Sequence, residues 1–110
     1  MLVTKPYDRM HAQSYARRWA LSRNPVFYNF DSVGGDCTNF VSQCLYAGSC
    51  VMNYTPTFGW YYISEDDRAP AWTGVEYLFN FLTQNKGEGP FGYEARPRDI
   101  EIGDIVQLGN

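Results

Sequence analysis

A cysteine that follows two glycines and an aspartate constrains this chain more than any other feature. Gly34, Gly35 and Asp36 supply turn chemistry, and Cys37 comes directly after them. Beyond the cysteine, apolar residues recur at helical spacing: Phe40, Val41, Cys44 and Leu45. This pattern predicts a helix over residues 37–46 that has the cysteine in its first turn, at the rim of the apolar face. We expect Ala47-Gly48 to end that helix.

The first turn of a helix is a distinctive place for a thiol. The leading backbone N–H groups have no partner within the helix, and the aligned peptide dipoles add partial positive charge there. Both effects stabilise a thiolate, which is the nucleophilic form of cysteine. The same N–H groups can hold the oxyanion that forms when a thiolate attacks an amide carbonyl. The segment therefore predicts part of an acyl-transfer site with Cys37 as nucleophile, although a cysteine can also pack as a small buried hydrophobe.

Two further helices and a terminal strand are expected from hydrophobic periodicity. Residues 8–22 form one amphipathic pattern with Asp8 as N-cap, and residues 73–85 form another. Thr73 and Glu76 have the spacing of a capping box at the start of the second pattern. Residues 105–108 follow a Gly-Asp turn and predict a strand. Together these elements indicate an α+β fold.

The middle of the chain lacks helical periodicity. Residues 60–63 predict a short strand or the wall of a cleft, and the charged run 65–68 predicts a solvated turn.

Composition limits the class of protein. A chain of 110 residues corresponds to one small domain, residues 1–110, and 45% hydrophobic with 17% aromatic residues fits a folded globule. The net charge of −3 offers no basic surface for nucleic acid. A mean hydropathy of −0.40, with no apolar run near 18 residues, argues against a membrane span. No secretory signal precedes Tyr7, so we expect either a cytosolic protein or a domain excised from a longer chain.

Three cysteines and one histidine, His11, do not predict a metal site. The separations between Cys37, Cys44 and Cys50 match no zinc spacing, and no cofactor is expected. Cys44 lies on the predicted core face, and Cys50 follows the helix in a loop. A link between these two cysteines is left open, and the cysteines do not define a cellular compartment.

Four residues besides the cysteine are candidates for binding substrate. The carboxylate of Asp36 could orient a substrate amine or the base, or could simply cap the helix. Asn39 could polarise a carbonyl or make surface hydrogen bonds. Tyr28 and Trp60 could line a cleft or pack in the core. We expect His11 to be an exposed helix residue rather than the base.

The run GGDCTNFVSQCLYAG closely resembles a bacterial family called the putative amidase domain. The preceding YDR…YARRWALSRNPVFYNFD and the later GDIVQL extend the resemblance from Tyr7 to about Leu108. That family is similar to the papain-like cysteine hydrolases, which include cell-wall amidases and endopeptidases. The resemblance implies a bacterial protein that acts on peptide or cell-wall amides. It also implies a structural role for Asp104.

The resemblance also implies that the domain is incomplete in these 110 residues. In the papain-like group the base is a histidine on the strand after the GDxV-type strand, which would lie beyond Asn110. We therefore expect the nucleophile-bearing helical part plus the first strand, with little turnover by itself. Exposed apolar surface where further strands belong could drive self-association. The domain could act outside the cytoplasm if it is part of a longer secreted chain.

Three functions remain open from the sequence. The first is a cysteine amidase or peptidase that works through a thioester on Cys37. The second is an acyl transferase with the same thioester and an amine acceptor. The third is a non-catalytic module that binds a peptide or glycan through the same fold.

Overall fold

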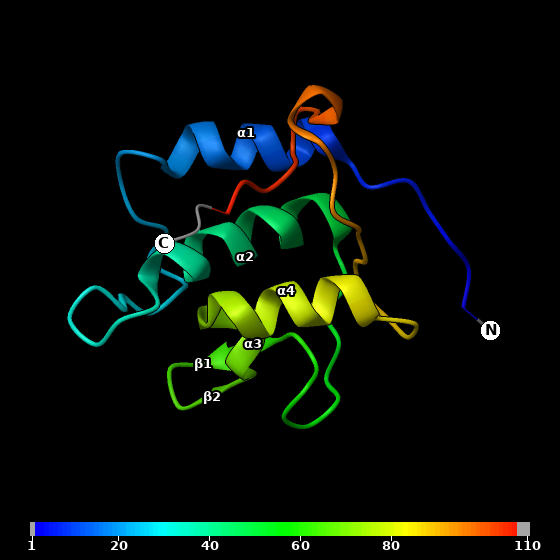
Figure 1. The fold of residues 1–110 in the computed structure, drawn as a ribbon. Helices are drawn as coiled ribbons and strands as arrows, with labels where there is room; N and C mark the ends of the chain where they lie inside the picture. The colour runs from blue at the N-terminus through cyan, green and yellow to red at the C-terminus, as the bar shows by residue number, and fades with distance from the viewer. Residues whose placement is uncertain (1, 108–110) are drawn as a thin grey trace.

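The computed structural model of the chain describes residues 2–107, and its elements are short helices and a small hairpin that lies at one edge beside α3 (Figure 1). The elements are α1 (Arg9–Trp19), α2 (Asp36–Ser49), β1 (Tyr62–Ser64), β2 (Asp67–Arg68), α3 (Pro70–Thr73), α4 (Val75–Gln84) and a 3-10 turn η1 (Pro97–Asp99). Among the described residues, no helix has the length and apolar content needed to cross a bilayer.

The first helix confirms its predicted start. Asp8 is the N-cap of α1, and its Oδ1 accepts a hydrogen bond from the backbone N–H of His11 at 2.9 Å. α1 lies beside α2 and runs in the opposite direction (Figure 1). The backbone N–H of Asp8 donates to the carbonyl of Gly48 at 2.9 Å, so the start of α1 is joined to the end of α2.

The cysteine helix is longer than predicted at its C-terminal end. Gly48 does not stop it; α2 continues through Ser49 and is capped by Cys50 at φ 61°. A Cβ on Gly48 would lie 2.4 Å from Cε1 of Tyr7, so this position has no room for a side chain. It allows the segment that leads into α1 to approach α2 closely, a role that the sequence pattern does not distinguish from a helix stop.

The predicted capping box is wrong. α4 has Gly74 as its N-cap with no side-chain cap, and Thr73 is instead the last residue of the short helix α3. Pro70 starts α3, and the N–H of Gly74 closes it by donating to the Pro70 carbonyl at 2.8 Å. The Thr73 hydroxyl is therefore left to accept a hydrogen bond from Nε of Arg68 at 3.1 Å.

The core is built from two tryptophans and the apolar faces of three helices. Trp60 and Trp72 are both fully buried, with ring centroids 4.9 Å apart. Ser42 of α2 joins them, since its hydroxyl accepts from Nε1 of Trp60 at 3.1 Å and donates to the carbonyl of Trp72 at 2.9 Å. The remaining buried members of this cluster are Leu45, Met52, Ala71, Leu78 and Phe81.

The only sheet among the described residues is the hairpin of β1 and β2, antiparallel with Tyr62 opposite Arg68 and Ser64 opposite Asp67. The strand predicted at 60–63 is thus found slightly later in the chain, and the charged run forms the hairpin turn and its second strand.

The strand predicted at 105–108 is not present in residues 105–107, and Leu108 lies outside the described residues. A strand needs a neighbour to satisfy its backbone groups, and residues 2–107 place no strand beside this segment. Side chains near α1 hold the preceding turn instead: the Tyr7 hydroxyl donates to the carbonyl of Gly103 at 2.9 Å, and Arg9 pairs with Asp104 at 2.5 Å. Asp104 thus has the structural role expected of it.

Candidate functional site

Cys37 lies in the first turn of α2, as the sequence predicted, and its side chain is exposed. The first hydrogen bond of the helix runs from the N–H of Asn39 to the carbonyl of Gly35 at 2.9 Å. The N–H groups of residues 36–38 therefore precede the helical ladder, and this is the end of the helix dipole that carries partial positive charge. The thiol thus shares one helix terminus with backbone donors that have no acceptor within the helix.

Gly35 fixes the position of that terminus. It is the N-cap of α2 with φ 91°, a left-handed conformation that favours glycine. A Cβ on this residue would also lie 2.7 Å from the carbonyl oxygen of Thr73. The start of α2 is therefore packed directly against the end of α3, and only a residue without a side chain fits between them.

Asp36 binds the loop that precedes α2 rather than capping the helix. Its carboxylate accepts two hydrogen bonds from Arg23, each 2.9 Å, and one from the N–H of Phe30 at 3.1 Å. The paired Arg23 guanidinium, assisted by the Phe30 N–H and Asn39, lowers the pKa of Asp36. The cap prediction for Asp36 is wrong because Gly35 takes the cap position. With its oxygens used internally, this carboxylate is not set up to orient a substrate amine.

Asn39 is an internal residue with 1% of its surface exposed. Its Oδ1 accepts from Nε1 of Trp72 at 2.9 Å, and its Nδ2 donates to the carbonyl of Tyr28 at 3.2 Å. The expectation of surface or substrate hydrogen bonds is therefore not met. The amide instead joins α2 to the core and to the segment that carries Tyr28.

The two aromatic candidates differ in position. Trp60 is fully buried in the core, so the structure gives it the packing role and leaves no face for a ligand. Tyr28 is 37% exposed and lies next to the site, because its backbone carbonyl binds Asn39 and its ring packs edge-on against Phe30 at 5.0 Å. Interaction with the Glu65 carboxylate raises the pKa of Tyr28, which places its hydroxyl near the β1–β2 turn.

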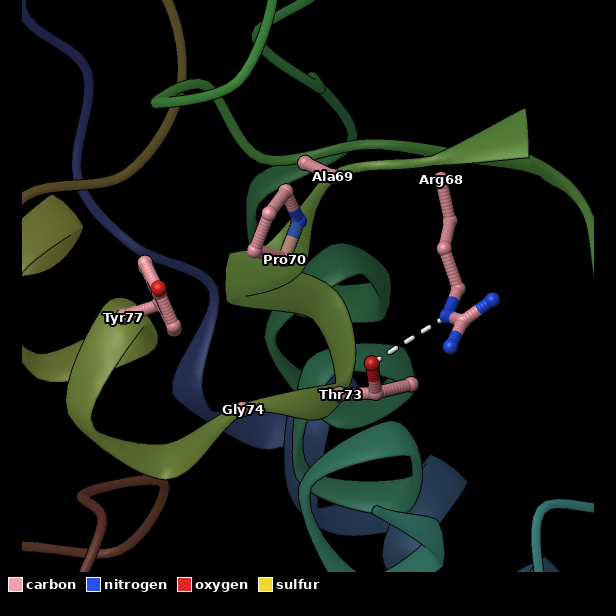
Figure 2. Close-up of a pocket in the computed structure, with 6 residues that line it drawn as sticks. All are labelled: Arg68, Ala69, Pro70, Thr73, Gly74 and Tyr77. Atoms are coloured by element: carbon pink, nitrogen blue, oxygen red, sulfur yellow. Dashed lines mark hydrogen bonds between the residues drawn. The ribbon is translucent and has the colours of Figure 1, made fainter. Parts of the chain in front are cut away.

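A pocket of about 420 Å³ lies against α3 and the start of α4 (Figure 2). It is lined by Arg68, Ala69, Pro70, Thr73, Gly74 and Tyr77. Thr73 is the residue that abuts Gly35, so the pocket lies next to the helix terminus that carries Cys37. Sequence reasoning missed this pocket because its residues fall in a predicted turn and at a predicted capping box.

The histidine and the other two cysteines lie away from this terminus. The start of α1, which carries the exposed His11, is bonded to Gly48, eleven residues after Cys37 and about 16 Å further along α2. Burial raises the pKa of Cys44 to about 11. Cys50 is exposed at the opposite end of α2, and all three cysteines are free thiols. Residues 2–107 contain no group of three or more histidine, cysteine or acidic residues that could hold a metal ion.

The structure adds Arg23, Ser42 and Arg68 to the residues that organise the site. Ser42 had a detectable signal, since it lies between Val41 and Leu45 on the apolar side of the predicted helix, where a hydroxyl requires a partner. Arg23 had no such signal, because its partner Asp36 is 13 residues away. Arg68 bonds to Glu65 and Thr73, three and five residues away, but the sequence predicted only a solvated turn at this arginine.

The model of the family described as putative amidase domain matches residues 6–110. The chain belongs to this family. The family description suggests amide hydrolysis as the coarse chemical class of the domain.

One similar protein is the uncharacterized protein YhbB of Bacillus subtilis (strain 168), with 35% identity over 102 residues. The match covers 91% of this chain and 32% of the relative, so the chain spans about a third of that protein's length. The comparison with solved structures returns no match.

Proposed function

We propose that this domain carries the nucleophile of a cysteine amidase or peptidase and that Cys37 is that nucleophile. The observation that carries the proposal is the exposed thiol at the N-terminus of α2, next to N–H groups that precede the helical ladder. Family membership supplies the amide chemistry. The fold that we propose is papain-like, with further strands and the base supplied by sequence outside these 110 residues.

The reaction that we propose proceeds through a thioester. The Cys37 thiolate bonds to the amide carbonyl carbon, and the carbonyl electron pair moves onto oxygen, where the free N–H groups of the first turn can donate to it. Collapse of this intermediate breaks the C–N bond, and the amine leaves with a proton from the general acid. Water then attacks the thioester, gives up a proton to the base and releases a carboxylic acid and the thiolate. We propose peptide or cell-wall amides as the substrate class.

The base is the part that these residues do not provide. His11 is the only histidine in the sequence, and it lies near the far end of α2. A general base contributes on the order of a hundredfold or more, and the leaving amine must also be protonated. We therefore propose that the 110 residues alone have little or no turnover.

Activity assays on two lengths of chain test this proposal. A longer chain with a downstream histidine is expected to hydrolyse peptide amides, and Cys37→Ser is expected to reduce its rate by about a hundredfold or more. Cys50→Ser is the matched control, since it removes an exposed thiol at the other end of the same helix, and it should leave the rate unchanged. Full activity in Cys37→Ser, or loss of activity in His11→Gln, would contradict the proposal.

The same assay distinguishes the other two functions. Formation of an amide product when an amine acceptor is added would indicate an acyl transferase. Ligand binding by the longer chain without any turnover would indicate a binding module.

A further inference from the structure

The side chain of Arg68 is held in a fixed orientation at the pocket. Its Nε donates to the Thr73 hydroxyl at 3.1 Å, and its Nη1 donates to the carbonyl of Glu65. The guanidinium lies 4.4 Å from the centre of the Phe30 ring. Thr73 ends α3, Glu65 lies in the β1–β2 turn and Phe30 precedes α2. Because three segments hold the guanidinium in place, little side-chain entropy is lost when it binds a ligand.

Arg68 has donors to spare. A guanidinium offers five N–H groups, and only two of them have protein acceptors among residues 2–107. Within the same residues it makes no ion pair, although Glu65 and Asp67 are near it in sequence. The three remaining N–H groups can donate to a carboxylate, which accepts charge-assisted hydrogen bonds from a guanidinium.

The rest of the pocket complements this cation. Figure 2 shows Arg68 and Tyr77 on opposite sides of the turn at Thr73 and Gly74, with Pro70 between them. Pro70 and the Tyr77 ring are exposed and offer apolar surface to a carbon chain, whereas Ala69 is fully buried. This open pocket thus has one charged end, at Arg68, and an apolar wall.

Two contacts place this pocket beside the proposed nucleophile. Thr73 packs against Gly35, which comes two residues before Cys37. The Cα atoms of Gly35 and Cys37 are therefore at most about 7.6 Å apart. Phe30, which lies under the Arg68 guanidinium, donates its N–H to Asp36 at the same helix terminus. The residues just before Cys37 therefore contact the residues that line the pocket or hold Arg68.

We infer that the Arg68 pocket binds a carboxylate of the amide substrate that Cys37 attacks. The inference rests on the proposed function and specifies its substrate class. That class is amides with a nearby negative charge, which is either a C-terminal carboxylate or an acidic side chain.

The test uses peptide electrophiles that react with a thiol by conjugate addition, so that turnover is not required. Acryloyl-Gly-Ala is compared as free acid and as carboxamide, and acryloyl-Gly-Glu-amide is compared with acryloyl-Gly-Gln-amide. The measured quantity is the rate of adduct formation at Cys37 divided by the rate at Cys50, obtained by mass mapping. Cys50 is exposed on the same molecule and corrects for the intrinsic reactivity of each probe.

We expect this ratio to rise about tenfold when a probe carries a carboxylate. Arg68→Gln should abolish the preference, whereas Arg98→Gln, which removes an equal charge from the exposed 3-10 turn, should retain it. A preference for the free acid alone identifies a terminal carboxylate, and one for the Glu probe alone identifies an acidic side chain. Both results support the subsite.

Equal ratios for charged and neutral probes in the wild-type protein would overturn the inference. If Arg68→Gln does not fold, wild-type protein at high salt replaces it, because screening should reduce a real preference. Faster labelling of Cys37 than of Cys50 by the neutral probes, with no carboxylate preference, would contradict the subsite and still support Cys37 as the nucleophile. If no probe labels Cys37 faster than Cys50, the proposed function itself is contradicted.

Discussion

The carboxylate of Asp36 joins three parts of the chain at the start of α2. Arg23 comes from the loop after α1, Phe30 from the segment before the glycines, and Asn39 from the helix itself. Because Arg23 stabilises the charged form, the pKa of Asp36 is lower in the folded protein than in the unfolded chain. The folded state therefore binds fewer protons at this position. The stabilisation is present above the unfolded pKa of about 3.9 and is lost as the pH falls through the lower, folded pKa.

Asp36→Asn is expected to lower the free energy of unfolding by about 1–2 kcal/mol at neutral pH. The difference from wild type should shrink as the pH is lowered below about 4, because the wild-type carboxyl then becomes protonated as well. Urea denaturation at neutral pH and near pH 3 measures both values. Asp99→Asn is the control: its exposed pair with Arg96 should contribute less than about 0.5 kcal/mol. A wild-type advantage over Asp36→Asn that does not change with pH would contradict this assignment.

At the scale of elements, α2 serves the site and the core at once. Its first turn presents Cys37, while Ser42 in its middle binds both core tryptophans. The helix itself was predictable, because its apolar period and its glycine entry are local signals. Its exact end and the partners of Ser42, Asn39 and Asp36 were not, because those depend on residues that fold against it from elsewhere in the chain.

Two serines of α2 provide a matched test of this role. Ser42→Ala leaves the buried Nε1 of Trp60 without its acceptor, which should cost about 1–3 kcal/mol of stability. The Ser49 hydroxyl is buried and has no hydrogen-bond partner among the described residues, so Ser49→Ala should be neutral or slightly stabilising. Urea unfolding of both variants measures the contrast. Similar losses for the two would show that Ser42 does not hold the core in the way described.

Two glycines before α2 test how its N-terminus is positioned. Gly34 and Gly35 both have φ near 90°, so alanine at either position should cost about 1–2 kcal/mol from backbone strain. Only at Gly35 would the new Cβ also meet Thr73, whereas nothing lies within 4 Å at Gly34. The free energy of unfolding of Gly35→Ala should therefore be about 1–3 kcal/mol lower than that of Gly34→Ala. Equal stabilities in thermal or urea unfolding would argue against the close contact of α2 with α3.

The whole molecule is a small helical domain that matches the putative amidase family over nearly all of its length. It covers about a third of its Bacillus relative, so the activity of a complete protein remains a proposal. Apolar side chains such as Val26, Phe58 and Phe91 are exposed, and self-association through such surface stays a prediction. At this scale the sequence indicated the family and the helices. The sequence pattern predicted a strand that residues 105–107 do not form, because a strand needs a neighbouring strand and local pattern does not supply one.

The central claim is that the N-terminus of α2 activates Cys37, and the three cysteines of the chain test it together. Cys37 and Cys50 are both exposed but occupy opposite ends of one helix, so backbone N–H groups lie at the first and backbone carbonyl groups at the second. Cys44 should be slowest, because its pKa of about 11 keeps it protonated at neutral pH.

The measurement is the rate of iodoacetamide alkylation at each cysteine, obtained by mass mapping at neutral pH. Cys37 is expected to react about three to ten times faster than Cys50, and the difference should disappear in urea when the helix unfolds. Cys37→Ser, as control, should leave the Cys50 rate unchanged. A Cys50 rate equal to or greater than that of Cys37 in the folded protein would contradict the account.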